Sequence, residues 1–326
     1  MKAIVIRQPG AFDVLQLEET AIPTPNAGEV LINVAVAGIN YADMMLLRGG
    51  TPGPHAAQYP MIPGFEVAGI IEAVGAGVTE FTPGMRVAAV LEHGGYAEYA
   101  VAPVEKTFLV PDSIDFADAT ALLVQGLTAY GLIHDAAKLQ AGESILVEAA
   151  AGGVGSLAVQ LAKLAGATVI GAASGSKLEL VRALGADVAL DYTQPGWGQQ
   201  VYAATHGRGV DVVLECVGGQ VALESFHNLA PLGRDVIFGG ASGQMLPLSE
   251  LLMPMSFKGI SVSGFGGPWL RPGRAQVAHK ALTEYVASGQ LRVQRGPEFP
   301  LDQAGAALGA IASRQTTGKV VLRVRD

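Results

Sequence analysis

Residues 144–155 read Ser-Ile-Leu-Val-Glu-Ala-Ala-Ala-Gly-Gly-Val-Gly, and this stretch decides the fold. An apolar run long enough for one strand meets a cluster of glycines, and residues 156–165 then carry leucines at helical spacing. A strand, a glycine turn and a helix in this order form the context in which a glycine motif predicts a dinucleotide site. The first glycine of the usual G-x-G-x-x-G pattern is Ala150 here.

Each glycine of this turn has an expected role. Gly152 has no Cβ, so a pyrophosphate can approach the backbone, and Gly155 lets the helix pack close to the strand. The start of the helix offers N–H groups and the positive end of its dipole to phosphates. We therefore predict that Gly152, Gly153 and Val154 line the pyrophosphate of a bound cofactor.

The next predicted strand, Thr168–Ala173, ends without the acidic residue that an NAD site uses to bind the ribose 2′-hydroxyl. The sequence continues with Ser174, Gly175, Ser176 and Lys177. Two hydroxyl groups and a cation suit a 2′-phosphate, so Ser174 and Lys177 predict NADPH as the cofactor. The alternative is that Lys177 is only a solvated residue in the first turn of a helix.

Composition and charge narrow the class of protein. The chain has 326 residues, 50% apolar and 15% charged, and this length predicts about two domains. The net charge of −8 and the lack of a basic run argue against a nucleic-acid surface. No apolar stretch reaches the roughly 18 residues of a membrane helix, and residues 1–7 lack a signal-peptide layout. The one cysteine, Cys216, cannot form an internal disulfide, so we expect a cytoplasmic protein.

The pattern along the chain predicts an α/β protein in which a β-rich domain precedes a doubly wound parallel sheet. Residues 1–120 read as short strands between turns, including Thr-Pro-Gly-Pro at 51–54, and predict a barrel-like or sandwich-like domain. Residues 121–264 alternate strands with helices, which is typical of a Rossmann sheet. Residues 265–326 form a return segment that completes the first domain. The Rossmann strands are expected at 145–149, 169–172, 188–190, 210–215, 235–239 and 259–264.

This domain order resembles the medium-chain dehydrogenase/reductase superfamily. Several motifs are similar to those of its quinone oxidoreductase (zeta-crystallin-like) branch and span nearly the whole chain. The resemblance implies a GroES-like catalytic domain beside the Rossmann domain, and a homodimer joined by the edge strand at 259–265. The motifs are Gly-Ile-Asn-Tyr-Ala-Asp at 38–43, Pro-Gly-Phe-Glu-Val-Ala-Gly at 63–69, Gly-Gly-Tyr-Ala-Glu-Tyr at 94–99, Gln-Gly-Leu-Thr-Ala-Tyr at 125–130, Leu-Gly-Ala-Asp at 184–187 and Thr-Gly-Lys-Val-Val at 317–321.

The chain departs from the zinc alcohol dehydrogenases of the same superfamily. Those enzymes have a metal-binding histidine where this chain has Phe65, and a ligand cysteine in the region where it reads Gly-Ile-Asn at 38–40. Because a catalytic zinc needs about three N, S or O ligands from the protein, we expect a site without metal. Without a Lewis acid, reduction of an electron-poor acceptor is easier than oxidation of an alcohol.

The resemblance also implies which residues serve catalysis. Asn40 lies near the nicotinamide in the related reductases, and its amide suits a carbonyl or the nicotinamide ribose. Thr128 matches a position beside the nicotinamide. Tyr41 is a candidate proton donor. The structural alternatives are a turn asparagine and a helical threonine that bonds back to a carbonyl.

Further residues are expected to bind the cofactor. Tyr192 matches a tyrosine that flanks the 2′-phosphate or the adenine, although it also fits a half-buried loop aromatic. Lys319 lies in the return segment and fits either a cofactor contact or a surface lysine. Four residues follow the carboxyl ends of strands, where nucleotides bind in such sheets, although the glycines among them also fit plain turns. They are Phe238, Gly239, Phe265 and Gly266.

A tyrosine that serves as proton donor in enoyl reductases of the superfamily is absent, because its expected places hold Met45 and residues 51–54. Tyr41, Tyr59 and His93 are the substitutes nearby. We therefore predict an NADPH-dependent quinone reductase that acts without zinc on a small hydrophobic acceptor. The alternatives are an enoyl or alkenal reductase, and an NADPH-binding sensor or structural protein without turnover.

Overall fold

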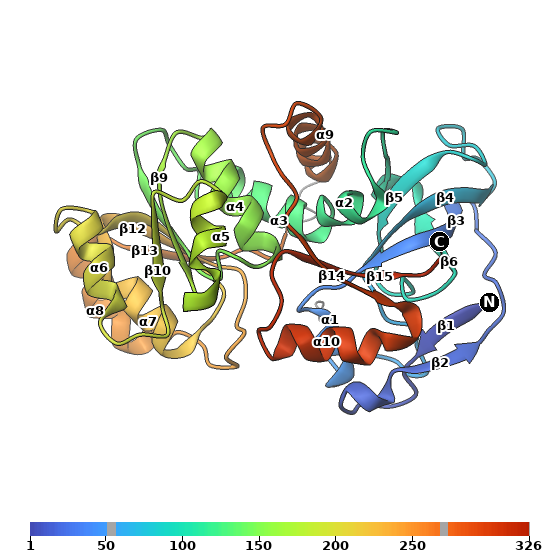
Figure 1. The fold of residues 1–326 in the computed structure, drawn as a ribbon, viewed down its shortest axis with the longest axis horizontal. Helices are drawn as coiled ribbons and strands as arrows, with labels where there is room; N and C mark the ends of the chain where they lie inside the picture. The colour runs from blue at the N-terminus through green and yellow to red at the C-terminus, as the bar shows by residue number, and fades with distance from the viewer. Residues whose placement is uncertain (51–56, 268–272, 326) are drawn as a thin grey trace. The chain divides into compact units, whose positions relative to one another are not determined.

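Two units make up the chain in a computed structural model that describes residues 1–50, 57–267 and 273–325 (Figure 1). Unit 1 comprises Met1–Gln125 and Val293–Asp326, and unit 2 comprises Gly126–Arg292. The boundaries fall at 125/126 and 292/293, whereas the sequence predicted 120/121 and 264/265. The difference arises because helix α9 (Arg274–Ala287) stays with unit 2, where the Arg274 guanidinium pairs with Asp135 at 2.6 Å.

A six-stranded parallel sheet forms the centre of unit 2. Its spatial order is β10-β9-β8-β11-β12-β13, and every neighbouring pair is parallel. This order reverses direction between β8 and β11, which is the doubly wound arrangement that the sequence predicted. The strands are β8 (Ser144–Val147), β9 (Thr168–Ala173), β10 (Val188–Asp191), β11 (Val210–Glu215), β12 (Leu229–Ile237) and β13 (Ser261–Gly264).

Helices cover both faces of this sheet (Figure 1). Helices α4 (Gly153–Leu164) and α5 (Leu178–Ala183) lie on one face, and α6 (Trp197–Ala204), α7 (Gly219–His227) and α8 (Leu248–Lys258) lie on the other. Trp197 and Phe226 from these helices pack on Leu146 and Val213 of the strands. The sequence did not predict α8, because Pro254 lies inside it and a proline usually ends a helix.

Unit 1 is built on a seven-stranded sheet with the order β14-β15-β3-β4-β5-β7, and β6 also pairs with β3. Strand β15 comes from the last part of the chain and pairs antiparallel with β3, so this part completes unit 1. The strands of the seven-stranded sheet are β3 (Glu29–Gly38), β4 (Glu66–Val74), β5 (Arg86–Val90), β6 (Tyr99–Pro103), β7 (Thr107–Leu109), β14 (Arg295–Pro300) and β15 (Lys319–Arg323). A separate two-stranded sheet pairs β1 (Lys2–Val5) with β2 (Gln16–Glu19). The helices are α1 (Asp43–Leu47), α2 (Phe116–Ala121) and α10 (Ala304–Ala312).

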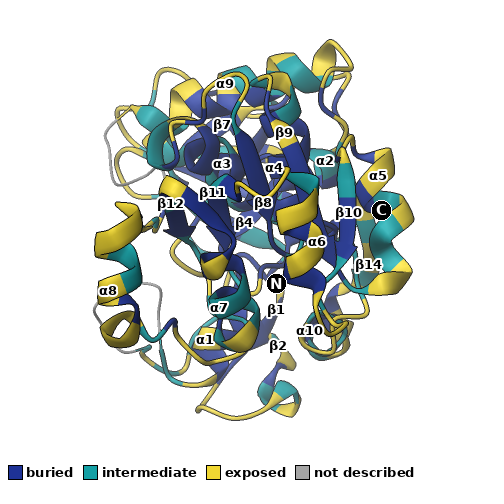
Figure 2. Cartoon of the chain, turned by 90° about the vertical axis from the view of Figure 1, so that its left-hand side faces the viewer, coloured by how far each residue is buried: buried dark blue, intermediate teal, exposed yellow. Residues whose placement is uncertain are grey.

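The central strands of unit 2 are buried, whereas its edge strand β13 is not. In Figure 2, β8 and β11 are dark blue, whereas α8 is largely yellow. Within the described residues, no helix is long and apolar enough to cross a membrane. The turn predicted at 51–54 lies outside the described residues.

Candidate functional site

The glycine turn of unit 2 brings a helix against the end of a strand. A Cβ placed on Gly155 would lie 2.3 Å from the carbonyl oxygen of Ala149 and 2.8 Å from the Cα of Ala150. These distances leave no room for a side chain, so the predicted role of Gly155 in close helix–strand packing is confirmed. The backbone of Ala149 has a positive φ of 47°, which turns the chain out of β8.

Helix α4 starts at this turn with unpaired backbone donors. Gly152 is its N-cap residue and provides no side-chain cap, and the first N–H inside the helix that bonds back is that of Ser156, to Gly152 O at 2.9 Å. The N–H groups of residues 153–155 therefore have no partner within the helix. A Cβ on Gly152 would stand 3.1 Å from Ala149 O, so a side chain there would crowd the turn. Contact of these N–H groups with a phosphate stays a prediction.

The loop after β9 carries the residues predicted to bind a 2′-phosphate. Ser174 and Lys177 are both partly exposed, and the Lys177 N–H donates to Ser174 O at 2.9 Å, so one tight turn holds both. The Tyr192 N–H donates to Ala173 O at 3.3 Å. The structure thus brings Tyr192, Ser174 and Lys177 to one corner of the sheet, and their contact with a cofactor stays a prediction.

A carboxylate that was not among the predicted site residues lies at the same corner. Asp191 ends β10 and pairs with Ala173 in the sheet register. A Cβ on Gly175 would lie 2.6 Å from Asp191 Oδ2. Bonds from Thr193, and a weaker one from the backbone of Gly175, lower the pKa of Asp191, so it is ionised at neutral pH. The negative charge of Asp191 and the positive charge of Lys177 therefore lie at the same corner of the sheet.

The remaining candidates of unit 2 also follow strand ends. Phe238 and Phe265 lie just beyond β12 and β13. The Phe238 N–H donates to Glu215 O at the end of β11, and the Phe265 N–H donates to Ile237 O at the end of β12, both at 2.9 Å. The Phe265 ring packs on α3 (Val124–Gly131), because a Cβ on Gly131 would lie 2.3 Å from it. Thr128 is half-buried one helical turn earlier. Gly239 and Gly266 are exposed beside their aromatic neighbours.

Unit 1 holds a buried ion pair beneath Asn40. Lys319 and Glu66 have exposed side-chain fractions of 2% and 0%, and the Lys319 ammonium donates to Glu66 Oε1. Asn40 Nδ2 donates to the same Glu66 oxygen at 2.8 Å, and Lys319 Nζ lies 3.4 Å from Asn40 Oδ1. Val124 N–H satisfies the other Glu66 oxygen at 2.7 Å. Lys319 is therefore no surface lysine, and it fixes the orientation of the Asn40 amide.

A second buried carboxyl group supports the Asn40 backbone. Asp43 Oδ2 accepts the Asn40 N–H at 2.7 Å, while Oδ1 has no hydrogen-bond partner among the described residues. The buried Tyr96 ring faces this carboxyl group. Burial raises the pKa of Asp43 to about 7, although the bond from Asn40 opposes this. Neither Asp43 nor Glu66 was predicted as a site residue, because only the folded chain shows that they contact Asn40.

The candidate proton donors of unit 1 differ in exposure. Tyr41 follows Asn40 and is 43% exposed. The Tyr59 hydroxyl donates to Leu46 O, so its proton is already engaged. His93 is exposed in the loop after β5. Among these three residues, Tyr41 is exposed and is also adjacent to Asn40 in the chain.

Comparison with known proteins identifies the family. A model described as alcohol dehydrogenase GroES-like domain matches residues 26–112, and one described as zinc-binding dehydrogenase matches residues 153–278. A quinone oxidoreductase of Pseudomonas aeruginosa is 35% identical over 98% of this chain and 99% of the relative. The chain belongs to the quinone oxidoreductase branch of the medium-chain dehydrogenase/reductase superfamily.

Two further similarities concern this reductase. A 2-haloacrylate reductase of a Burkholderia species is 34% identical, with 98% of each chain covered. The solved structure of Escherichia coli quinone oxidoreductase complexed with NADPH has a TM-score of 0.92 and 29% identity, covering 99% of this chain and 100% of that chain.

The residues of this reductase do not fit the zinc that the second family model names. Phe65 offers no donor atom, and the Asn40 amide is held by Glu66 and Lys319. The Lys319 ammonium already supplies a positive charge to Glu66. Over the described ranges, no group of three or more His, Cys, Asp and Glu side chains is arranged to hold a metal ion.

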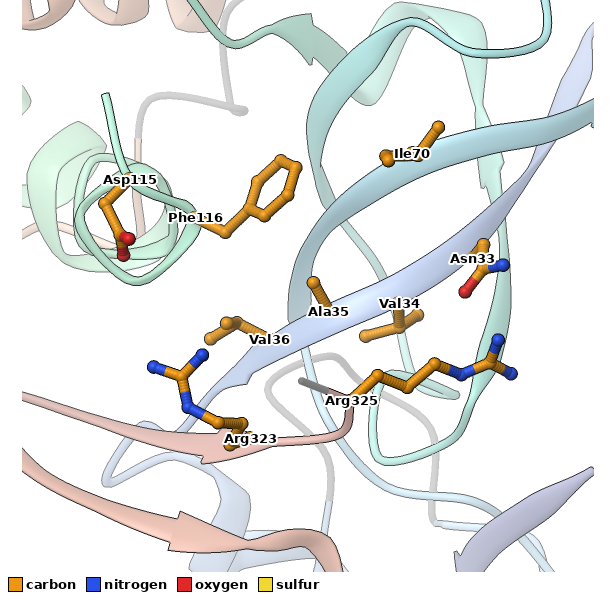
Figure 3. Close-up of a pocket in the computed structure, with 9 residues that line it drawn as sticks. All are labelled: Asn33, Val34, Ala35, Val36, Ile70, Asp115, Phe116, Arg323 and Arg325. Carbon is orange, nitrogen blue, oxygen red and sulfur yellow. The ribbon is translucent and has the colours of Figure 1, made fainter. Parts of the chain in front are cut away.

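A separate cavity of about 340 Å³ lies on the sheet of unit 1 (Figure 3). Its floor is formed by β3 and β4, the Phe116 ring stands at one side, and Arg323 and Arg325 lie along its border. Arg323 pairs with Glu298, and Arg325 stacks on Tyr99 with 4.6 Å to the ring centroid. None of the predicted site residues lines this cavity.

Proposed function

We propose that the protein is an NADPH-dependent reductase that transfers a hydride to a quinone. The observation that carries the proposal is the carboxyl edge of the unit 2 sheet. The alanine- and glycine-rich turn before α4 and the loop that holds Ser174 and Lys177 both lie at this edge. The similarity to the Pseudomonas quinone oxidoreductase over nearly the full length of both chains supports the choice of acceptor.

The proposed cofactor-binding residues of unit 2 contact different parts of NADPH. Gly152, Gly153 and Val154 line the pyrophosphate, and Ser174 and Lys177 bind the 2′-phosphate. Tyr192, Phe238, Gly239, Phe265 and Gly266 surround the rest of the cofactor. NADPH, when bound, supplies the hydride. The role of the chain is to hold the nucleotide and to exclude water from the reacting atoms.

The acceptor side depends on Asn40. Its amide nitrogen carries two hydrogens, and Glu66 accepts one of them at 2.8 Å. The second is available to a quinone carbonyl or to the nicotinamide ribose, while Lys319 keeps the amide from rotating. Thr128 contributes a hydroxyl group beside the nicotinamide. The oxygens of a reduced quinone take protons from solvent, so quinone reduction needs no dedicated proton donor.

A second candidate function is reduction of an activated carbon–carbon double bond. The similarity to the 2-haloacrylate reductase favours it. Such a reaction places a proton on carbon after hydride transfer, and this step benefits from a positioned acid. Tyr41 is the exposed hydroxyl group next to Asn40.

Tyr41→Phe separates the two acceptors. If the protein is a quinone reductase, the kcat for a benzoquinone should stay within about twofold of the wild-type value. If it reduces alkenes through Tyr41, the kcat for a conjugated enone should fall about 10²-fold or more. Steady-state NADPH consumption with each acceptor, with product analysis, measures both. Tyr202→Phe, at a tyrosine that is 50% exposed on α6, is the control. NADPH binding without consumption with any acceptor would indicate a sensor or structural protein instead.

We also propose that the protein is a homodimer joined along β13. This strand pairs with β12 on one side and is the last strand of the sheet in the described part of unit 2. Its residues are exposed or half-buried. Beside it, α8 exposes Leu252 and Phe257 at 62% and 82%. An open, largely uncharged edge of this kind is a surface that pairs readily with a second copy.

Val262→Pro should convert the dimer to a monomer. The Phe265 N–H donates inward to Ile237 O, and donors alternate along a strand, so the N–H of Val262 points to the open edge. A proline there removes an edge donor without touching the β12 ladder. Light scattering should give twice the 33.5 kDa chain mass for the wild type and the single mass for the variant. Val262→Thr keeps the donor and should remain dimeric; equal masses for the two variants would contradict the proposal.

A further inference from the structure

Three acidic side chains lie together inside unit 2, although no sequence motif marks them as a group. Glu148 follows β8, Glu215 ends β11 and Asp235 lies in β12, with exposed fractions of 0%, 1% and 0%. The register pairs Val213 with Asp235, and Leu214 with the residue before Glu148. Because side chains alternate along a strand, the three carboxyl groups share the sheet face that α7 covers. We call them the acid cluster.

The two glutamates of the acid cluster hold the turn between β11 and α7. Glu148 Oε2 accepts the N–H groups of residues 216 and 217, at 3.1 and 3.0 Å, and its Oε1 accepts the Ser225 hydroxyl at 2.6 Å. Glu215 Oε1 accepts the Gly218 N–H at 2.6 Å. Three consecutive backbone donors therefore end on two carboxyl groups, and the shape of the turn depends on both.

This turn and the glycine turn belong to the same edge of the sheet. Glu148 immediately precedes the residues that turn out of β8 toward α4, and its carboxylate reaches across to the turn after β11. Nucleotides bind outside the carboxyl ends of the strands, near the point where the strand order reverses. In this sheet that point lies between β8 and β11. Glu148 thus joins the two turns that flank the proposed cofactor position.

No cation compensates the acid cluster among the described residues that face it. Ser225 faces it from α7 and the Cys216 thiol from the turn; burial raises the pKa of that thiol. Both oxygens of Asp235 are without a hydrogen-bond partner in the described part of the chain. Burial raises the pKa of Glu148, raises that of Glu215 to about 7, and holds that of Asp235 well above its usual range. The cluster therefore gains negative charge as the pH rises through neutrality.

We propose that Glu148 and Glu215 are positioning residues that link cofactor binding to protonation, with NADPH bound more tightly while Glu215 carries a proton. A neutral carboxyl group still accepts N–H donors, so the turn keeps its shape. An ionised cluster adds negative charge behind the edge that receives the phosphates. At roughly 10 Å and an effective dielectric constant near 20, one unit charge changes an affinity on the order of tenfold. The inference rests on the proposed NADPH cofactor.

The test is NADPH titration at pH 6.5, 7.5 and 8.5 with the wild type, Glu215→Gln and Glu250→Gln. Glutamine keeps the acceptor for Gly218 but cannot ionise. Glu250 is an exposed acid of α8 and serves as the control. Between pH 6.5 and 8.5, the Kd of the wild type and of the control should rise about fivefold to tenfold more than that of Glu215→Gln. The comparison cancels titration of the cofactor phosphate, which all three proteins share.

Chemical denaturation of the protein without cofactor gives an independent readout. The folded state keeps a proton on Glu215 that the unfolded chain releases above its ordinary pKa of 4.5. The free energy of unfolding should therefore fall as the pH rises from about 4.5 to 7, and less so in Glu215→Gln. Glu148→Gln, which removes the neighbouring charge that raises the pKa of Glu215, should flatten both profiles if Glu215→Gln does not fold. Parallel profiles for all variants would overturn the inference alone, whereas no NADPH binding at any pH would overturn the proposed cofactor as well.

Discussion

Lys319→Met is expected to lower the free energy of unfolding of unit 1 by about 3–5 kcal/mol. The substitution leaves Glu66, which is fully buried, with the Asn40 amide and the Val124 N–H but without a counter-charge. A buried carboxylate that loses its cation keeps its desolvation cost and loses the attraction that offset it. Methionine fills much of the same volume, so the loss reports charge rather than packing.

Urea denaturation followed by circular dichroism measures this loss, and hydrogen exchange of β3 and β15 locates it in unit 1. The double variant Glu66→Gln with Lys319→Met removes both charges and should recover at least half of the lost stability. Lys280→Met, in an exposed pair with Glu284 on α9, should change stability little. A loss below about 1 kcal/mol for Lys319→Met, or no recovery in the double variant, would refute the role assigned to this pair.

Lys177→Ala is expected to weaken NADPH binding by about 10- to 100-fold and NADH binding by less than about threefold. A hydrogen bond between charged groups contributes about 1.5–3 kcal/mol, and each 1.4 kcal/mol corresponds to a factor of ten. Only NADPH carries the 2′-phosphate that Lys177 is proposed to meet. The nearby Asp191 makes the lysine more important, because without it the loop presents a carboxylate to the phosphate.

Isothermal titration with both cofactors gives the two ratios. Lys163→Ala is the matched control, because this lysine lies in the last turn of α4, pairs with Asp187 at 2.8 Å and should leave both affinities unchanged. An equal loss for NADPH and NADH would mean that Lys177 supports the loop without reading the phosphate. No loss for either would assign the phosphate to other residues.

Features that depend on short stretches of sequence were predictable. The glycine turn, the strand before it and the helix after it are encoded within about twenty residues, and the doubly wound parallel sheet followed from the alternation of strands and helices. The lack of space at Gly155 agrees with its predicted role. Helix α8 was not predicted, because its exposed apolar residues follow no clear period and Pro254 interrupts it.

The polar interior was not predictable, because its partners are far apart in the chain. Lys319 and Glu66 are separated by 253 positions, and a sequence pattern gives no sign that they pair. The same holds for the acid cluster, whose members lie in β11, in β12 and directly after β8, and become neighbours only through the sheet register. Asp191 likewise reaches Gly175 only because β10 lies beside β9. The sequence thus indicated the glycine turn, whereas the buried charged groups could be identified only from the folded structure.

The split organisation of unit 1 has a consequence for synthesis on the ribosome. Unit 2 is continuous in the chain, so it can fold before residues 293–326 have been translated. Unit 1 cannot, because β15 and Lys319 reach β3 and Glu66 only near the end of translation. Until then the nascent domain carries an open sheet edge and an uncompensated carboxylate, which is the period in which a chaperone has most to protect.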